Sequence, residues 1–224
     1  ELKIRGDIKR ILTIVPKSAM LQWQSELKEH FNEVFHLYDS GMITSMARTF
    51  ANINADEEYN FWTQHNQIIV STDALKPLEK RQGWSKERVD EYNKYRMQAV
   101  LVADFDLVII DEAHKMGGAT SIVSRYIFAQ EICNSVPNVM LLTATPHRGK
   151  ADHFRRILQL LDPDAFAGEG LPGIKELEPY VIRTEKRFAV DYEGKKLFNE
   201  RRTHRFDVFL DINKHHKQMA LYDT

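Results

Sequence analysis

The sequence predicts an α/β protein: a parallel β-sheet with helices on both faces. Short, continuous runs of aliphatic residues recur along the chain and alternate with stretches of helical periodicity. Strands without apolar and polar alternation are typical of parallel sheets that helices cover on both sides. Two of these runs end abruptly in polar tetrads, and ligands bind such sheets at the carboxyl ends of the strands. We therefore look for function at those ends.

The first elements follow from residues 11–15, an apolar run that Pro16 ends. A helix is expected next, with Ser18 as its cap. Its apolar face recurs at helical spacing through Met20, Trp23, Leu27 and Phe31. The remaining strands are expected at 34–41, 67–71, 107–110 and 139–142, and the remaining helices at 86–99, 121–133 and 151–161. Residues 42–64 have a mixed, helical character.

The pattern changes after residue 162, where DPDAFAGEGLPG has the Pro and Gly content of a linker. Beyond it, residues 180–211 resemble short strands, with Phe206, Val208 and Leu210 in alternation. We therefore expect a first domain over residues 1–165. Residues 166–224 are expected to form a linker and a C-terminal appendage of short strands that leads toward a further lobe.

The composition indicates one soluble domain. The chain has 224 residues, 43% of them hydrophobic, which suits a single sizeable core. No apolar stretch reaches the roughly 18 residues of a membrane span, and the N-terminal segment lacks a signal peptide's apolar block. Cys133 is the only cysteine, so neither an internal disulfide nor a cysteine-based metal cage can form. A cytoplasmic protein is expected.

The first polar tetrad, residues 111–114, suits nucleotide hydrolysis. This reaction needs a Mg²⁺ ion on the phosphates and a polarised water in line with the terminal phosphorus. Asp111 at a strand tip can hold the hydrated cation, and Glu112, turned to the other side, can orient the water. From the residues alone, an ordinary acidic turn after a strand explains the pair equally well.

Several motifs in a fixed order resemble one family. LVIIDEAHKM resembles the DEAD/DEAH-box motif of superfamily-two helicases, and LLTATP resembles their Ser/Thr-Ala-Thr coupling motif. Upstream, ILTIVPKSAMLQWQSEL and IIVST are similar to two DNA-contacting motifs of Swi/Snf-like ATPases. Downstream, TATPHRGKADHFRRILQLLDPDAF and YVIRTEK follow the order of bacterial Swi/Snf-like proteins. The resemblance extends over residues 5–223 and implies a RecA-like, three-layer first motor lobe.

The resemblance also implies roles for individual residues. Asp111 would coordinate Mg²⁺ through water, Glu112 would activate the hydrolytic water, and ATP would be the nucleotide. His114 would link the nucleotide to the coupling segment Thr143, Ala144 and Thr145, which relays the nucleotide state. From the residues alone, His114 also fits a hydrogen-bonded structural histidine, and the threonines also fit turn caps.

DNA contacts are implied for a set of loop residues that suit phosphates and do not read sequence: Pro16, Lys17, Gln22, Ser71 and Thr72. The chain carries 31 Lys and Arg against 32 Asp and Glu, so a DNA surface must be a local patch. A Pro-Lys-Ser turn before a helix also needs no ligand. Trp23 lies on the apolar helix face, which favours core packing over base stacking.

A phosphate-binding loop, Gly-x₄-Gly-Lys-Ser/Thr, is missing from the sequence. Gly149-Lys150 has Ala144 and Ala151 at the other required positions, and Gly194-Lys195 has Ala189 and Lys196. The expectation is a chain that begins after that loop and stops before the second lobe. In the family that the motifs resemble, the second lobe supplies an arginine worth roughly 10³–10⁵ in rate, so the isolated chain should hydrolyse ATP negligibly.

For the parent protein we expect an ATP hydrolase that translocates on double-stranded DNA. Two alternatives stay open. One is a strand-separating helicase subunit of a restriction or repair system, and the other is a non-catalytic lobe that docks DNA or protein.

Overall fold

The computed structural model describes residues 2–45, 60–116, 123–145, 151–168, 170–183, 188–199, 203–206 and 215. The chain divides into two compact units, Glu1–Leu177 and Glu178–Thr224. All residues proposed above for the site belong to the first unit.

The first unit is built on a five-stranded sheet in which every pairing is parallel, with the order β2-β3-β1-β4-β5. The strands are β1 (Ile11–Val15), β2 (His36–Tyr38), β3 (Gln67–Ser71), β4 (Leu107–Ile110) and β5 (Asn138–Leu141). The predicted α/β class with a parallel sheet is confirmed. Strands β1 and β3 are buried at every position, as their unbroken aliphatic runs indicate.

The helices are α1 (Leu2–Arg5), α2 (Met20–Phe31), α4 (Thr72–Leu75), α5 (Lys86–Leu101), α6 (Val123–Ser135), α7 (Ala151–Gln159) and α8 (Ile174–Leu177). Three 3₁₀ turns are η1 (Lys17–Ala19), η2 (Phe61–Thr63) and η3 (Ala113–Lys115). Of the segment expected to be mixed, residues 42–45 are helical, and residues 46–59 lie outside the described part. No helix among the described residues has the length and apolarity of a membrane span.

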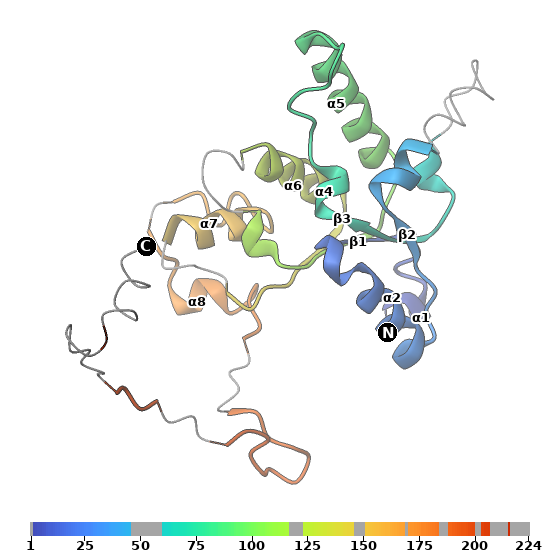
Figure 1. Cartoon of the computed structure of the whole chain (residues 1–224). Helices are drawn as coiled ribbons and strands as arrows, with labels where there is room; N and C mark the ends of the chain where they lie inside the picture. The colour runs from blue at the N-terminus through green and yellow to red at the C-terminus, as the bar shows by residue number, and fades with distance from the viewer. Residues whose placement is uncertain are drawn as a thin grey trace. The chain divides into compact units, whose positions relative to one another are not determined.

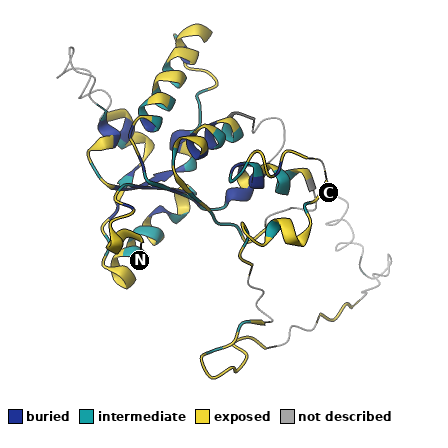
Figure 2. Ribbon diagram, turned by 180° about the vertical axis from the view of Figure 1, so that it is seen from behind, coloured by how far each residue is buried: buried dark blue, intermediate teal, exposed yellow. Residues whose placement is uncertain are grey.

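Helices lie on both faces of the sheet, with α2 on one side and α4, α5 and α6 on the other (Figure 1). The smaller core cluster joins α2 to β1 and β3 through Met20, Val15 and Ile69. The larger cluster joins the opposite face to α5 and α6 and includes Val100 and Ile132. In Figure 2 the inner strands β1 and β3 are buried, whereas much of α5 is exposed.

The connections from β1 and β4 go to opposite faces of the sheet. Strand β1 continues into α2, whereas β4 continues toward α6 on the other side (Figure 1). Because β1 and β4 are neighbours, the position between them is a topological switch point of the sheet. Open α/β sheets bind ligands in the crevice outside the carboxyl ends of the strands at that point.

Helix α2 differs from its prediction at both ends. Ser18 does not cap it, because the 3₁₀ turn η1 intervenes and the N-cap is Ala19, which has no side-chain hydrogen bond. Phe31, predicted on the buried face, is 70% exposed in the last turn, next to Asn32 in the left-handed C-cap conformation (φ 54°). Trp23 and Leu27 pack against the smaller core cluster as predicted.

The Pro- and Gly-rich segment after α7 is held on that helix. The Arg155 guanidinium donates to the carbonyls of Phe166 (3.0 Å) and Gly170 (2.6 Å). The Gln159 amide donates to the Phe166 carbonyl (3.0 Å), and the Phe166 ring is buried. This segment therefore belongs to the first compact unit. The domain boundary at residue 165 remains a prediction.

The described part of the second unit contains one isolated antiparallel bridge, between Val190 and Lys196. Asp191 stabilises the turn between them, since its Oδ1 accepts from the backbone N–H groups of Glu193 (3.0 Å) and Lys195 (2.9 Å). The described residues show no longer strand in this unit. Most of the predicted alternation, at Val208 and Leu210, lies outside them.

Candidate functional site at the carboxyl ends of the strands

The polar segments after β4 and β5 lie side by side. The two strands pair through Ile110 and Leu141, and the Leu142 N–H donates to the Ile110 carbonyl (2.8 Å). One step further, the Ala113 N–H donates to the Leu142 carbonyl (2.9 Å). The pairing of the strands thus continues into the tetrads that were singled out in the sequence.

The backbone turns sharply at Glu112, which adopts the left-handed conformation with φ 52° and ψ 42°. This conformation is unfavourable for a residue with a Cβ, and such strain is concentrated at functional sites. The turn separates the two neighbouring carboxylates. Asp111 contacts Trp23 on α2, and Glu112 contacts His114.

His114 connects the ends of the two strands. Its Nδ1 lies 3.0 Å from Oε2 of Glu112 and 3.0 Å from Oγ1 of Thr143. The ring is almost fully buried, and helix α7 lies against the η3 turn that carries it. Thr143 Oγ1 also accepts from the Thr145 N–H (3.2 Å). His114 is therefore both a hydrogen-bonded buried histidine and a bridge from the acidic pair to the coupling segment.

A hollow of about 330 Å³ opens beside the two carboxylates. We call it the acidic hollow; its lining is Pro16, Ser18, Ala19, Gln22, Trp23, Glu26, Asp111, Glu112 and Lys115. It lies at the switch point between β1 and β4, because Pro16 follows one strand and Asp111 the other. Its volume is in the range of small-molecule sites.

A larger hollow, of about 720 Å³, adjoins it and shares Pro16, Ser18 and Lys115 with it. We call it the basic hollow; its lining is Pro16, Lys17, Ser18, Thr72, Asp73, Lys115 and Arg125. Arg125 pairs with Asp73 at 3.5 Å. Within the described part of the chain, Lys17 and Lys115 form no ion pair. Two cations are thus left to attract an anion.

The residues predicted to contact DNA lie in three different surroundings: the basic hollow, the acidic hollow and a buried position at the start of α4. Pro16, Lys17 and Thr72 line the basic hollow, and Gln22 lines the acidic hollow, where its amide donates to Glu26 (2.8 Å). Ser71 is buried, and its Oγ accepts the Ala74 N–H (3.1 Å) as the N-cap of α4. This geometry gives Ser71 a capping role at the start of α4, and its contact with DNA stays a prediction.

Three residues of the site were missed or misjudged in the sequence. Lys115 follows the DEAH tetrad directly, so its place after a strand end could have been noticed. Arg125 lies on α6, where the sequence gives no sign of its approach to Lys17. For Trp23, core packing was predicted, but its hydrogen bond to Asp111 was not.

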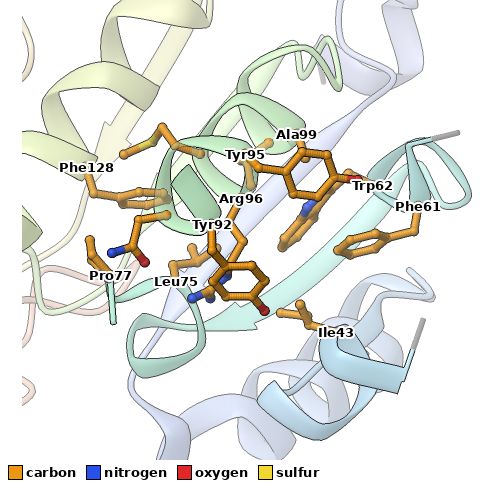
Figure 3. Close-up of a pocket in the computed structure, with 13 residues that line it drawn as sticks. Ile43, Phe61, Trp62, Leu75, Pro77, Tyr92, Tyr95, Arg96, Ala99 and Phe128 are labelled. Atoms are coloured by element: carbon orange, nitrogen blue, oxygen red, sulfur yellow. The ribbon is translucent and has the colours of Figure 1, made fainter. Parts of the chain in front are cut away.

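A third hollow lies under α5, and none of the predicted site residues lines it (Figure 3). It is mostly aromatic and aliphatic, with Phe61, Trp62 and Tyr92 around it. Arg96 crosses it and donates to the backbone carbonyls of Ala74 and Lys76. Burial lowers the pKa of Arg96 from its ordinary value. This contact supports the α4 segment beside the basic hollow.

Comparison with known proteins identifies the family. The model of the SNF2-related domain matches residues 2–170. The RNA polymerase-associated protein RapA of Actinobacillus succinogenes is 36% identical over 163 residues, which are 72% of this chain and 15% of that protein. The SWI2/SNF2 ATPase core of Sulfolobus solfataricus, solved in complex with double-stranded DNA, aligns with a TM-score of 0.47 and 16% identity. That alignment covers 73% of this chain and 27% of the solved one.

This chain therefore spans about one seventh of the length of its bacterial relative. The family model covers most of the chain, including both tetrads and both hollows. The chain belongs to the SNF2-related domain family, the Swi/Snf-like ATPases.

Proposed function

We propose that this chain is the first lobe of an ATP-driven motor that moves along double-stranded DNA. The observation that carries the proposal is the bridge from Glu112 through His114 to Thr143, at 3.0 Å on each side. This bridge joins a water-activating carboxylate to a hydroxyl-bearing turn on the next strand. An acidic turn with no further function has no need of such a connection.

The carboxylates fit a Mg²⁺ ion that arrives with ATP. Among the described residues, no group of three or more His, Cys, Asp or Glu could hold a metal. Mg²⁺ suits such a site, because it keeps several waters and takes one or two carboxylates together with substrate phosphates. When bound, it would neutralise charge on the phosphates. Asp111, partly exposed in the acidic hollow, would hold its hydration shell.

Glu112 would orient the attacking water and accept its proton, and His114 would hold the Glu112 carboxylate in place. Through the same ring, a movement of Glu112 on hydrolysis would reach Thr143, Ala144 and Thr145. The phosphate-binding loop and the arginine of a second lobe would come from other parts of the protein. We therefore propose the activity for the longer protein and negligible hydrolysis for the 224-residue chain alone.

The basic hollow would receive the DNA backbone. Lys17, Lys115 and Arg125 offer positive charge around a loop that has Thr72 on its other side. Contacts of this kind hold phosphates without reading sequence. Double-stranded DNA is proposed because the chain belongs to the Swi/Snf-like ATPases, which the sequence motifs lead us to expect to move along it. RNA polymerase, named in the description of the bacterial relative, is the candidate protein partner.

The test is Glu112→Gln in the full-length protein, assayed for ATP hydrolysis with and without duplex DNA. A general base contributes about 10²–10⁴-fold, so DNA-stimulated turnover should fall by at least about 100-fold while DNA binding remains. Glu131→Gln, an exposed carboxylate on α6, is the matched control and should hydrolyse at the wild-type rate.

Full turnover by Glu112→Gln would show that hydrolysis does not use this carboxylate, which is the result expected of a lobe that only docks its partners. A second assay separates the two motor types. A translocase displaces a third strand from a triplex and leaves a plain duplex paired, whereas a helicase subunit unwinds the duplex itself.

A further inference from the structure

Trp23 lies at the end of the first turn of α2 and reaches across to the acidic pair. Its indole Nε1–H donates to Oδ2 of Asp111, with 3.0 Å between the two atoms. The two residues are 88 positions apart in the chain. The ring itself packs on the smaller core cluster between α2 and the sheet. Trp23 thus links the packing of α2 to a single carboxylate oxygen.

The Asp111 carboxylate is held at both oxygens. Oδ2 accepts from Trp23, and Oδ1 accepts from the backbone N–H of Glu112 (2.8 Å). These two contacts fix the orientation of the carboxylate plane. An ionised carboxylate oxygen can accept two hydrogen bonds, so each oxygen keeps a position for a water molecule. This is the arrangement that a cation held through water needs.

Helix α2 also begins beside the basic hollow. The 3₁₀ turn η1, with Lys17 and Ser18, leads directly into α2, and Ser18 lines both hollows. A force on the η1 loop would therefore act on a helix whose first turn holds Asp111 through Trp23. A partly buried indole N–H needs a hydrogen-bond partner, and here that partner is a carboxylate of the site rather than a backbone carbonyl.

We propose that Trp23 is a positioning residue that orients Asp111 for the hydrated Mg²⁺ and couples it to the DNA-contacting loop. The inference rests on the proposed function, because it assigns a supporting residue to the same site. It predicts that loss of the indole N–H weakens metal binding and makes that binding insensitive to DNA. Core packing alone predicts neither effect.

The test compares Trp23→Phe with Trp84→Phe in the full-length protein. Phenylalanine keeps an aromatic ring in the core and removes the donor. The Trp84 ring contacts the guanidinium groups of Arg81 and Arg88 and lines neither hollow, so it serves as the control. Mn²⁺ binding in the presence of a non-hydrolysable ATP analogue, followed by electron paramagnetic resonance with and without duplex DNA, reports on the metal without turnover. The Mg²⁺ concentration for half-maximal hydrolysis is the second measurement.

We expect Trp23→Phe to raise the half-saturating concentrations of Mn²⁺ and Mg²⁺ by about tenfold. The variant should also abolish the effect of duplex DNA on metal binding. Trp84→Phe should bind both metals like the wild type. In an Asp111→Asn background, Trp23→Phe should cause no further loss. Wild-type affinity for both metals in Trp23→Phe would overturn the inference. So would a loss of metal affinity from Trp23→Phe that is as large in the Asp111→Asn background as in the wild-type background. If the unsubstituted protein shows no Mg²⁺-dependent hydrolysis, it is the proposed function that fails.

Discussion

The two ends of this parallel sheet hold their charged groups in opposite ways. At the amino end, the Arg10 guanidinium donates to the carbonyls of Trp62 (2.9 Å) and Ala103 (3.0 Å) and to Oδ1 of Asn66 (2.9 Å). It also lies 5.2 Å from the centre of the Phe105 ring. At the carboxyl end, Lys17 and Lys115 have no ion pair within the described residues and face a hollow.

The difference shows which end serves stability and which end serves binding. Charges at the amino end fasten loops to one another, so their hydrogen-bonding capacity is used within the chain. Charges at the carboxyl end keep capacity for a ligand, and the backbone there is strained at Glu112. Substitutions at the amino end should therefore reduce stability, and those at the carboxyl end should reduce activity.

The largest loss of stability is expected for Arg10→Ala. The variant removes charged hydrogen bonds to three acceptors on two loops and the contact with the Phe105 ring, so its free energy of unfolding should fall by about 3 kcal/mol. Lys17 lies at the opposite end of the sheet and its side chain is exposed, so Lys17→Ala should change the free energy of unfolding by less than about 0.5 kcal/mol. Urea denaturation of both variants measures the difference, and equal losses would remove the contrast between the two ends.

A smaller loss is expected for Asp106→Asn. Oδ2 of Asp106 accepts the N–H groups of Lys9 (2.7 Å) and Arg10 (2.8 Å), and these backbone hydrogen bonds lower its pKa from the ordinary value of 3.8. Loss of the charge should cost about 1–2 kcal/mol at pH 7. Asp104→Asn is the control, because Asp104 is exposed and asparagine tolerates its left-handed conformation (φ 57°).

The pH dependence of the Asp106 contribution has a definite sign. The folded state favours the carboxylate, so the stabilisation is complete above the unfolded pKa and is lost as the pH falls through the lowered folded pKa. The stability difference between wild type and Asp106→Asn should therefore shrink below about pH 4. A difference that stays constant from pH 7 to pH 3 would contradict this assignment.

Much of the sheet could be predicted from the sequence, because a strand buried on both faces leaves an unmistakable aliphatic run. The strands at 11–15, 67–71 and 107–110 have the predicted bounds. Neither α1 nor α4 was predicted, since each is only four residues long and has no hydrophobic periodicity to detect. The Ser18 cap was wrong because a 3₁₀ turn before a helix leaves the same sequence pattern as a cap.

The site could be predicted only at the level of the strands. Parallel strands bring their carboxyl ends to one edge, so the proximity of the tetrads at 111 and 143 followed from the fold class. The contact of Trp23 with Asp111 depends on the exact rotation of α2 over the sheet. Hydrophobic periodicity shows which face of a helix is buried, but not that rotation. The capping role of Ser71 depends on the direction of one hydroxyl group, which the motif does not contain.

The proposed function depends on His114 coupling the ends of β4 and β5. The most direct test of this coupling is a double-mutant cycle between His114 and Thr143 in the full-length protein. DNA-stimulated ATP hydrolysis would be measured for His114→Ala, Thr143→Val and the double variant. If the ends of β4 and β5 act as one unit, the double variant should be about as slow as the slower single variant, a coupling of at least about 1 kcal/mol. If the rate loss of the double variant equals the product of the two single-variant losses, the bridge between the acidic pair and the coupling segment is contradicted.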